Sequence, residues 1–170
     1  MRQLSLLAGV ICVTAVLGSS AYAQQQPAPP APPAWPLTGP TITIEQAKKA
    51  AAVAVASGKA TPYVYAFAVV DPTSGLVYFE KNDGVLTAAT EIAINKARTA
   101  ATFNRPTKSF FDAMESGHAW VVTLAPYLTA SPGGIPLMVD GKVIGGIGVS
   151  GSPTGLLDSI PAQAGADALK

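Results

Sequence analysis

One segment of the sequence, residues 133–151, limits the possible folds more than any other. Its letters are GGIPLMVDGKVIGGIGVSG, in which two apolar runs flank the pair Asp140-Gly141. An Asp-Gly pair readily takes the positive φ angles that a tight type I′ turn requires. The segment therefore predicts a β-hairpin, with one arm over residues 135–139 and the other over residues 143–149.

The second arm of this hairpin contains Gly145, Gly146 and Gly148. Glycines leave almost no side chain on a strand, so another backbone or a flat ligand can approach it closely. Close packing or a bulge is the more common reason for glycine in a strand. We keep both alternatives open: either a helix covers this arm, or Gly145 and Gly146 bind a cofactor.

Composition and charge restrict the classes of partner. The chain has 170 residues, enough for one domain, and 49% of them are hydrophobic, which is ample for a core. Its formal net charge is +1, and lysine and arginine do not cluster. Nucleic acids and anionic membrane surfaces are bound through clusters of positive charge. We therefore expect neither as a partner.

Residues 1–23 have the three parts of a secretory signal peptide. Met1-Arg2 is a positive start, residues 4–17 are an apolar run, and Ala21-Tyr22-Ala23 is a cleavage site of small residues. The apolar run is too short to span a bilayer. We expect an exported protein, periplasmic or extracellular, in which a proline-rich linker over residues 24–40 precedes a folded domain over residues 41–170.

Export would remove the only cysteine, Cys12, together with the signal peptide. Disulfides, thiolate catalysis and cysteine zinc sites would then be absent from the mature chain. We expect the mature protein to begin at Gln24, because Ala21 and Ala23 are the small residues that a signal peptidase requires. Mass spectrometry of the exported protein checks this, and an intact mass that still includes residues 1–23 would contradict it.

The rest of the chain predicts a mainly antiparallel sheet covered by helices, an α/β chain of the α+β kind. Thr43 followed by Gln46 matches a capping box, which predicts the start of the first helix. The expected elements are a helix ending at Gly58, strands over 63–71 and 76–81, helices over 87–103 and 107–115, an extended piece and a loop within 117–132, the glycine hairpin, and a helix over 159–169 with Asp158 as N-cap and Pro161 in its first turn.

Two strings of the sequence, in this order, are similar to those of one protein family. Residues 96–107 read KARTAATFNRPT, and the second hairpin arm reads VIGGIGVSG and is followed by AGADAL. Over residues 42–170 the chain resembles the GlcG/HbpS-type haem-binding proteins. The resemblance implies a profilin-like α/β/α sandwich, haem as a cofactor, a homo-oligomer, and a membrane-bound sensor or transporter as a partner.

His118 and Tyr127 are the candidates for an axial haem ligand, since imidazole and phenolate both ligate haem iron. The alternatives are a histidine that forms local hydrogen bonds and a tyrosine at the rim of the fold. His118 is the only histidine of the chain. A cage of several histidines and a catalytic pair of histidines are therefore excluded.

Lys96, Arg98 and Arg105 are the basic groups of the string that resembles the family. They could pair with haem propionates or with a small anionic organic acid. The alternative is a salt bridge within the domain, for which the acidic candidates are Asp71, Asp83, Asp112 and Asp158. For Arg105 we favour the structural alternative, because it lies at a helix end.

Glu91 is the candidate for metal binding. The resemblance implies that in some secreted relatives an acidic residue follows three positions later and that the pair is linked to iron. In this chain that later position is Ile94. The alternative for Glu91 is an exposed ion pair on the helix surface.

These observations lead to three hypotheses for the function. The first is a secreted haem-binding protein that sequesters or presents haem or helps to sense it, and that is not an enzyme. The second is a small enzyme or accessory factor acting on an anionic organic acid, and the third is a structural oligomeric module. A serine hydrolase is disfavoured because Ser150 lacks the Gly-x-Ser-x-Gly spacing.

Overall fold

The structure is a computed structural model that describes Pro36 and residues 38–170. The predicted signal peptide, Cys12 and the predicted linker up to residue 35 lie outside the described residues. None of the helices in the described part of the chain has the length and the apolar character that crossing a bilayer requires.

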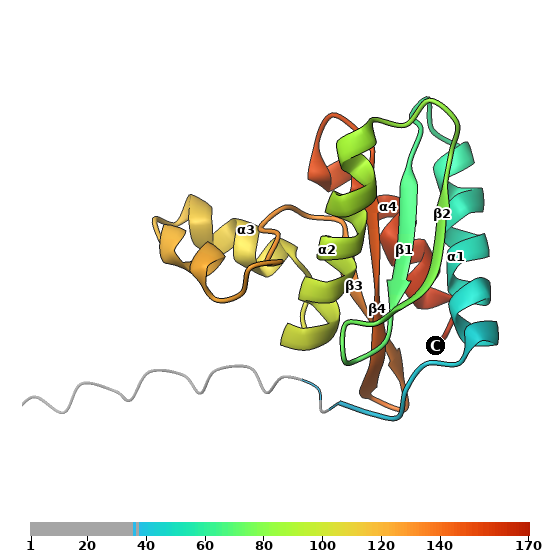
Figure 1. Ribbon diagram of the computed structural model, residues 1–170, viewed down its shortest axis with the longest axis horizontal. Coiled ribbons are helices and arrows are strands. Elements are labelled where there is room, and N and C mark those ends of the chain that lie inside the picture. The colour runs from blue at the N-terminus through green and yellow to red at the C-terminus, as the bar shows by residue number, and fades with distance from the viewer. Residues whose placement is uncertain (1–35, 37) are drawn as a thin grey trace, which may run out of the picture. The chain divides into compact units, whose positions relative to one another are not determined.

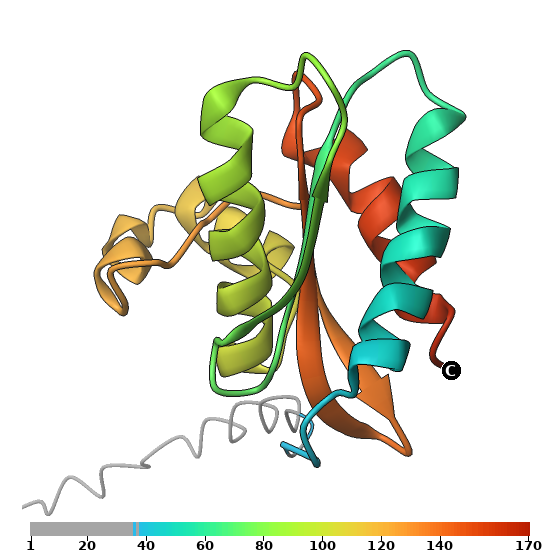
Figure 2. The same cartoon turned by 45° about the vertical axis from the view of Figure 1, so that its right-hand side comes forward.

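The domain is a four-stranded antiparallel sheet between two layers of helices. The strands follow the order β2-β1-β4-β3 across the sheet. Helices α1 and α4 cover one face and α2 covers the other, which confirms the predicted sheet with helices on both sides (Figures 1 and 2). The elements are α1 (Ile44–Lys59), β1 (Ala66–Val70), β2 (Leu76–Lys81), α2 (Thr87–Phe103), α3 (Lys108–Glu115), the short 3-10 helix η1 (Ala119–Thr123), β3 (Gly134–Val139), β4 (Lys142–Ser150) and α4 (Gly155–Asp167).

The β3–β4 hairpin turns where the sequence predicts it. Asp140 and Gly141 have φ angles of 50° and 72°, which are the two positive values of a type I′ turn. Strand β4 is longer than its neighbour β1. Beyond the end of β1, the chain before α1 lies beside β4 in its place. There the amide of Gly39 donates to the carbonyl of Val143. The folded domain therefore includes Gly39, which the sequence analysis placed in the linker.

The glycines of β4 lie where the chain itself approaches the strand. A Cβ at Gly146 would overlap the carbonyl oxygen of Ala97, and one at Gly148 would overlap that of Ala93, both on α2. A Cβ at Gly145 would overlap the carbonyl oxygen of Val70. The expectation that Gly145 and Gly146 contact a cofactor is therefore corrected, because backbone of the domain occupies both positions.

The sheet divides the core into two parts of different size, and the residues at and just before β1 show this. Tyr65, Phe67 and Val69 point toward α1 and α4, where large side chains fill the space. Ala66 and Ala68 point toward α2, where the packing residues are mostly alanine. Small residues on this face let the α2 backbone approach the sheet closely, in agreement with the glycines of β4.

The first and last helices begin in different ways. Thr43 and Gln46 form the predicted capping box at α1. Helix α4 begins at Gly155, so the predicted start after Asp158 is wrong, and Pro161 lies inside the helix instead of in its first turn. Asp158 does not cap the helix because Thr154 occupies the N-cap position, and the carboxylate of Asp158 accepts hydrogen bonds from the amide of Ser152 and from a lysine on α2.

Residues 108–131, here called the arm, project from the sheet on the side of α2 (Figure 1). The predicted extended piece after Gly117 is wrong, since residues 119–123 form the 3-10 helix η1. Strands β2 and β3 are the edges of the sheet, and neither of them pairs with a segment of the arm. Phe110 and Val121 are buried, while Trp120 is 59% exposed.

Candidate functional site

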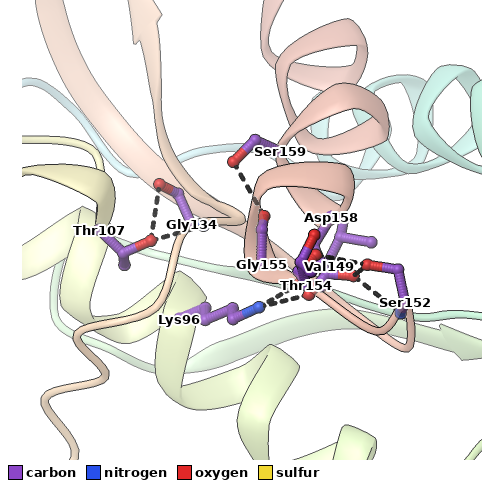
Figure 3. A network of polar contacts seen from close by, with 9 residues as sticks. All are labelled: Lys96, Thr107, Gly134, Val149, Ser152, Thr154, Gly155, Asp158 and Ser159. Atoms are coloured by element: carbon purple, nitrogen blue, oxygen red, sulfur yellow. Dashed lines mark hydrogen bonds and ion pairs between the residues drawn. The ribbon is translucent and has the colours of Figure 1, made fainter. Parts of the chain in front are cut away.

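Lys96 lies inside the domain, in an ion pair with Asp158 (Figure 3). Its Nζ atom is 2.7 Å from Oδ2 of Asp158 and donates to the carbonyl of Val149 at 3.1 Å. The two side chains are 1% and 4% exposed. Burial lowers the pKa of Lys96, and the nearby carboxylate of Asp158 opposes that shift. Lys96 therefore forms the salt bridge within the domain that the sequence analysis kept as an alternative to propionate binding.

A second buried contact lies next to this ion pair. The amide of Gly134 donates to Oγ1 of Thr107 at 2.9 Å, and the amide of Thr107 donates to the carbonyl of Gly134 at 3.0 Å (Figure 3). A Cβ at Gly134 would overlap the carbonyl oxygen of Lys96. These contacts tie α2, the start of α3 and β3 together at one edge of the sheet.

The two arginines have separate structural partners. Arg98 is half-buried, and its Nε donates to the carbonyl of Ser74 in the turn between β1 and β2. The guanidinium carbon of Arg105 lies 4.4 Å from the centre of the Phe110 ring, within the range of a cation–π contact. Burial lowers the pKa of Arg105. The structure does not bring these arginines together at one site.

His118 and Tyr127, the predicted axial ligands, both lie on the arm. His118 is exposed and precedes η1, and its amide donates to the carbonyl of Ala113. Tyr127 is half-buried, and its hydroxyl donates to Oγ1 of Thr102 at 3.3 Å. The hydrogen bond of His118 is made by its backbone amide and leaves the role of the imidazole open, and the role of both residues as haem ligands stays a prediction.

Glu91 is exposed on α2. Within Pro36 and residues 38–170, no group of three or more histidine, cysteine, aspartate or glutamate side chains is placed to hold a metal ion. The described residues therefore do not gather a set of ligands around Glu91.

A pocket that the sequence analysis missed lies beside the edge strand β3. It is an open groove with a volume of about 630 Å³, within the range of small-molecule sites. We call it the β3 groove. The residues that line it are Ser57 of α1, Pro106 and Lys108 at the start of α3, Ile135 of β3, and Ser159, Ile160, Gln163, Ala164 and Asp167 of α4.

The sequence carries a weak signal for this groove. Ile160, Gln163, Ala164 and Asp167 are spaced three, four and seven positions apart, which places them on one face of a helix. That pattern is common to any amphipathic helix and does not mark a ligand site. Apart from Ser159, the remaining lining residues come from three other elements, so that only the folded chain brings them together.

The antiparallel sheet between helices places the protein in the α+β sandwich class. The family model described as "Haem degrading protein HbpS-like" matches residues 42–167. The chain belongs to this HbpS-like family, as the resemblance in the sequence predicted.

Relatives from several bacteria agree with this assignment. Protein GlcG of Escherichia coli K12 is 41% identical over 83 residues, which are 49% of this chain and 61% of GlcG, so the match spans less than two thirds of that protein. An uncharacterized 15.0 kDa protein of Citrobacter freundii, from the dhaT-dhaS intergenic region, is 32% identical over 114 residues, which are 65% of this chain and 80% of that protein.

Solved structures have the same fold. A double mutant of HbpS from Streptomyces reticuli has a TM-score of 0.72 at 30% identity, over 84% of this chain and 99% of that chain. A PduOC complex with haem has a TM-score of 0.70 at 22% identity, over 76% of this chain and 96% of that chain, which shows similarity of fold alone.

Proposed function

We propose that this protein binds haem in the β3 groove. The observation that carries the proposal is the combination of membership in the HbpS-like family with a groove of about 630 Å³ whose lining includes Ile135, Ile160 and Pro106. Haem is a flat and largely apolar ring, and ligand sites are typically concave and apolar with a few polar groups. The haem complex of PduOC, a protein of the same fold, is consistent with the proposal.

The biological setting is part of the same proposal. The protein is exported to the periplasm or beyond, and there it sequesters or presents haem, or helps a membrane-bound sensor or transporter to detect it. It assembles into a homo-oligomer, for which the exposed apolar residues Met114, Trp120, Val122 and Leu124 of the arm offer contact surface.

Titration of haemin into the purified protein tests the proposal. We expect the Soret band to shift and to saturate at a fixed ratio of haemin to protein, because a defined site holds a defined number of rings. The same titration into urea-unfolded protein is the control and should not saturate. An unshifted band with the folded protein, together with thermal stabilisation by small organic acids, would contradict the proposal and favour a protein that acts on organic acids.

A further inference from the structure

We infer that the β3 groove holds a porphyrin through its ring and one carboxylate, without an iron ligand from the lining residues. A metal-free porphyrin dicarboxylate then binds there about as tightly as haem does. This inference rests on the proposed haem binding. It assigns the ligand class of the groove as porphyrins in general.

The apolar part of the groove suits a flat ring. Ile135 is buried at 9% exposure and comes from the edge strand, while Ile160 is 54% exposed on α4. Pro106 and Ala164 add flat, small surfaces beside them. A ring laid over these residues removes the exposed part of Ile160 from water, which is favourable in proportion to the apolar area covered.

The charges of the groove orient the ligand. Lys108 is the basic residue of the lining and Asp167 is the acidic one. Hydrogen bonds from Lys170 and Gln163 lower the pKa of Asp167 and keep its carboxylate negative. Lys170 pairs with Asp167 and compensates its charge, so Lys108 at the start of α3 is the lining residue that attracts a carboxylate of the ligand.

Lys108 can accept a new partner at little cost. It forms an ion pair with Asp112 at 2.7 Å, and the two side chains are 53% and 54% exposed. Exposed ion pairs of this kind contribute about 0 to 1 kcal/mol, because water competes with both charges. Exchange of Asp112 for a ligand carboxylate therefore leaves the domain intact.

Iron ligation does not contribute to this mode of binding. No residue of the groove lining provides an imidazole, a phenol or a sulfur, which are the usual side-chain ligands of haem iron. His118 and Tyr127 are on the arm and do not belong to the lining. Removal of the iron therefore leaves every contact of the groove in place.

Titrations with haemin and with metal-free protoporphyrin IX test the inference, the latter followed by its fluorescence. We expect the two dissociation constants to agree within about threefold, since the ring and carboxylate contacts are the same. Ile160→Glu should weaken both by at least about tenfold, because it places a charge under the ring. The matched control is Leu156→Glu, one turn earlier on α4, where the side chain is 55% exposed and outside the groove.

Lys108→Ala should raise the dissociation constants of both porphyrins severalfold. The matched control is Lys48→Ala, because Lys48 also forms an exposed ion pair, with Glu45, and lies outside the groove. His118→Ala and Tyr127→Phe should leave both dissociation constants unchanged. Near-ultraviolet circular dichroism confirms that each variant is folded before it is titrated.

Two results would overturn the inference. Binding of haemin without binding of metal-free protoporphyrin IX would show that iron ligation is essential. Loss of haemin binding in His118→Ala or Tyr127→Phe, with normal binding in Ile160→Glu, would place haem on the arm. In both cases the proposal that the protein binds haem would be retained, and the inference that the groove binds porphyrins by ring contacts would be rejected. A parent protein that binds neither porphyrin would reject both proposals.

Discussion

Gly148→Val is expected to lower the free energy of unfolding by about 3 kcal/mol or more, the upper part of the range for overpacked cores. The new Cβ would overlap the carbonyl oxygen of Ala93 and approach the amide nitrogen of Ala97, both in the backbone of α2. A flexible side chain could turn aside, but a helix backbone cannot do so without moving as a whole. Urea unfolding followed by circular dichroism measures the loss.

Valine is otherwise a better strand residue than glycine, so its strand propensity would raise the stability while its overlap with α2 lowers it. The matched control is Lys142→Val, on the same strand at an exposed position, where the change should stay within about 0.5 kcal/mol. Gly146→Val should also lower the melting temperature, because its Cβ meets the carbonyl oxygen of Ala97. If Gly148→Val is as stable as the parent, α2 does not pack on β4 as described.

Local chemistry explains why so much of the fold could be predicted from the sequence. The bounds of α2, residues 87–103, agree with the prediction, because the helical spacing of its alanines is a property of that segment alone. The type I′ turn at Asp140-Gly141 follows from two residues that accept positive φ angles. The capping box of Thr43 and Gln46 is likewise a contact between residues three positions apart.

Contacts between distant segments explain what could not be predicted. Asp158 was expected to cap a helix, because an aspartate before an apolar run usually does so. Its partner Lys96 lies 62 positions earlier in the chain. The sequence suggested Asp158 as one of four acidic partners and could not choose between them, since the choice depends on which segment, here the first turn of α4, the fold brings next to Lys96.

The β3 groove was missed for a related reason. Its lining comes from α1, the start of α3, β3 and α4, and most of its side chains are of types found on any helix surface. The residues that attract attention in the sequence, His118 and Tyr127, have a chemistry that stands out but lie outside the groove. The unusual chemistry of these two residues therefore drew the prediction to the arm, whereas the β3 groove lies at the edge of the sheet.

The ion pair between Lys96 and Asp158 provides the second large effect. Lys96→Met is expected to lower the free energy of unfolding by about 3 to 5 kcal/mol, the range for removing one partner of a buried pair. Methionine fills the volume of the lysine stem but leaves the carboxylate of Asp158 buried, with hydrogen bonds from Ser152 as its remaining contacts. Urea unfolding at neutral pH measures the loss.

The double variant Lys96→Met with Asp158→Asn separates charge from packing. It removes both charges, and the asparagine still accepts a hydrogen bond from the amide of Ser152, so it should recover a substantial part of the stability lost in Lys96→Met. The matched control is Lys48→Met, which breaks the exposed pair with Glu45 and should cost about 0 to 1 kcal/mol. Equal losses in Lys48→Met and Lys96→Met would contradict burial of the pair. A double variant less stable than Lys96→Met would mean that the isolated carboxylate carries no penalty, and that Asp158 holds the chain before α4 through Ser152 alone.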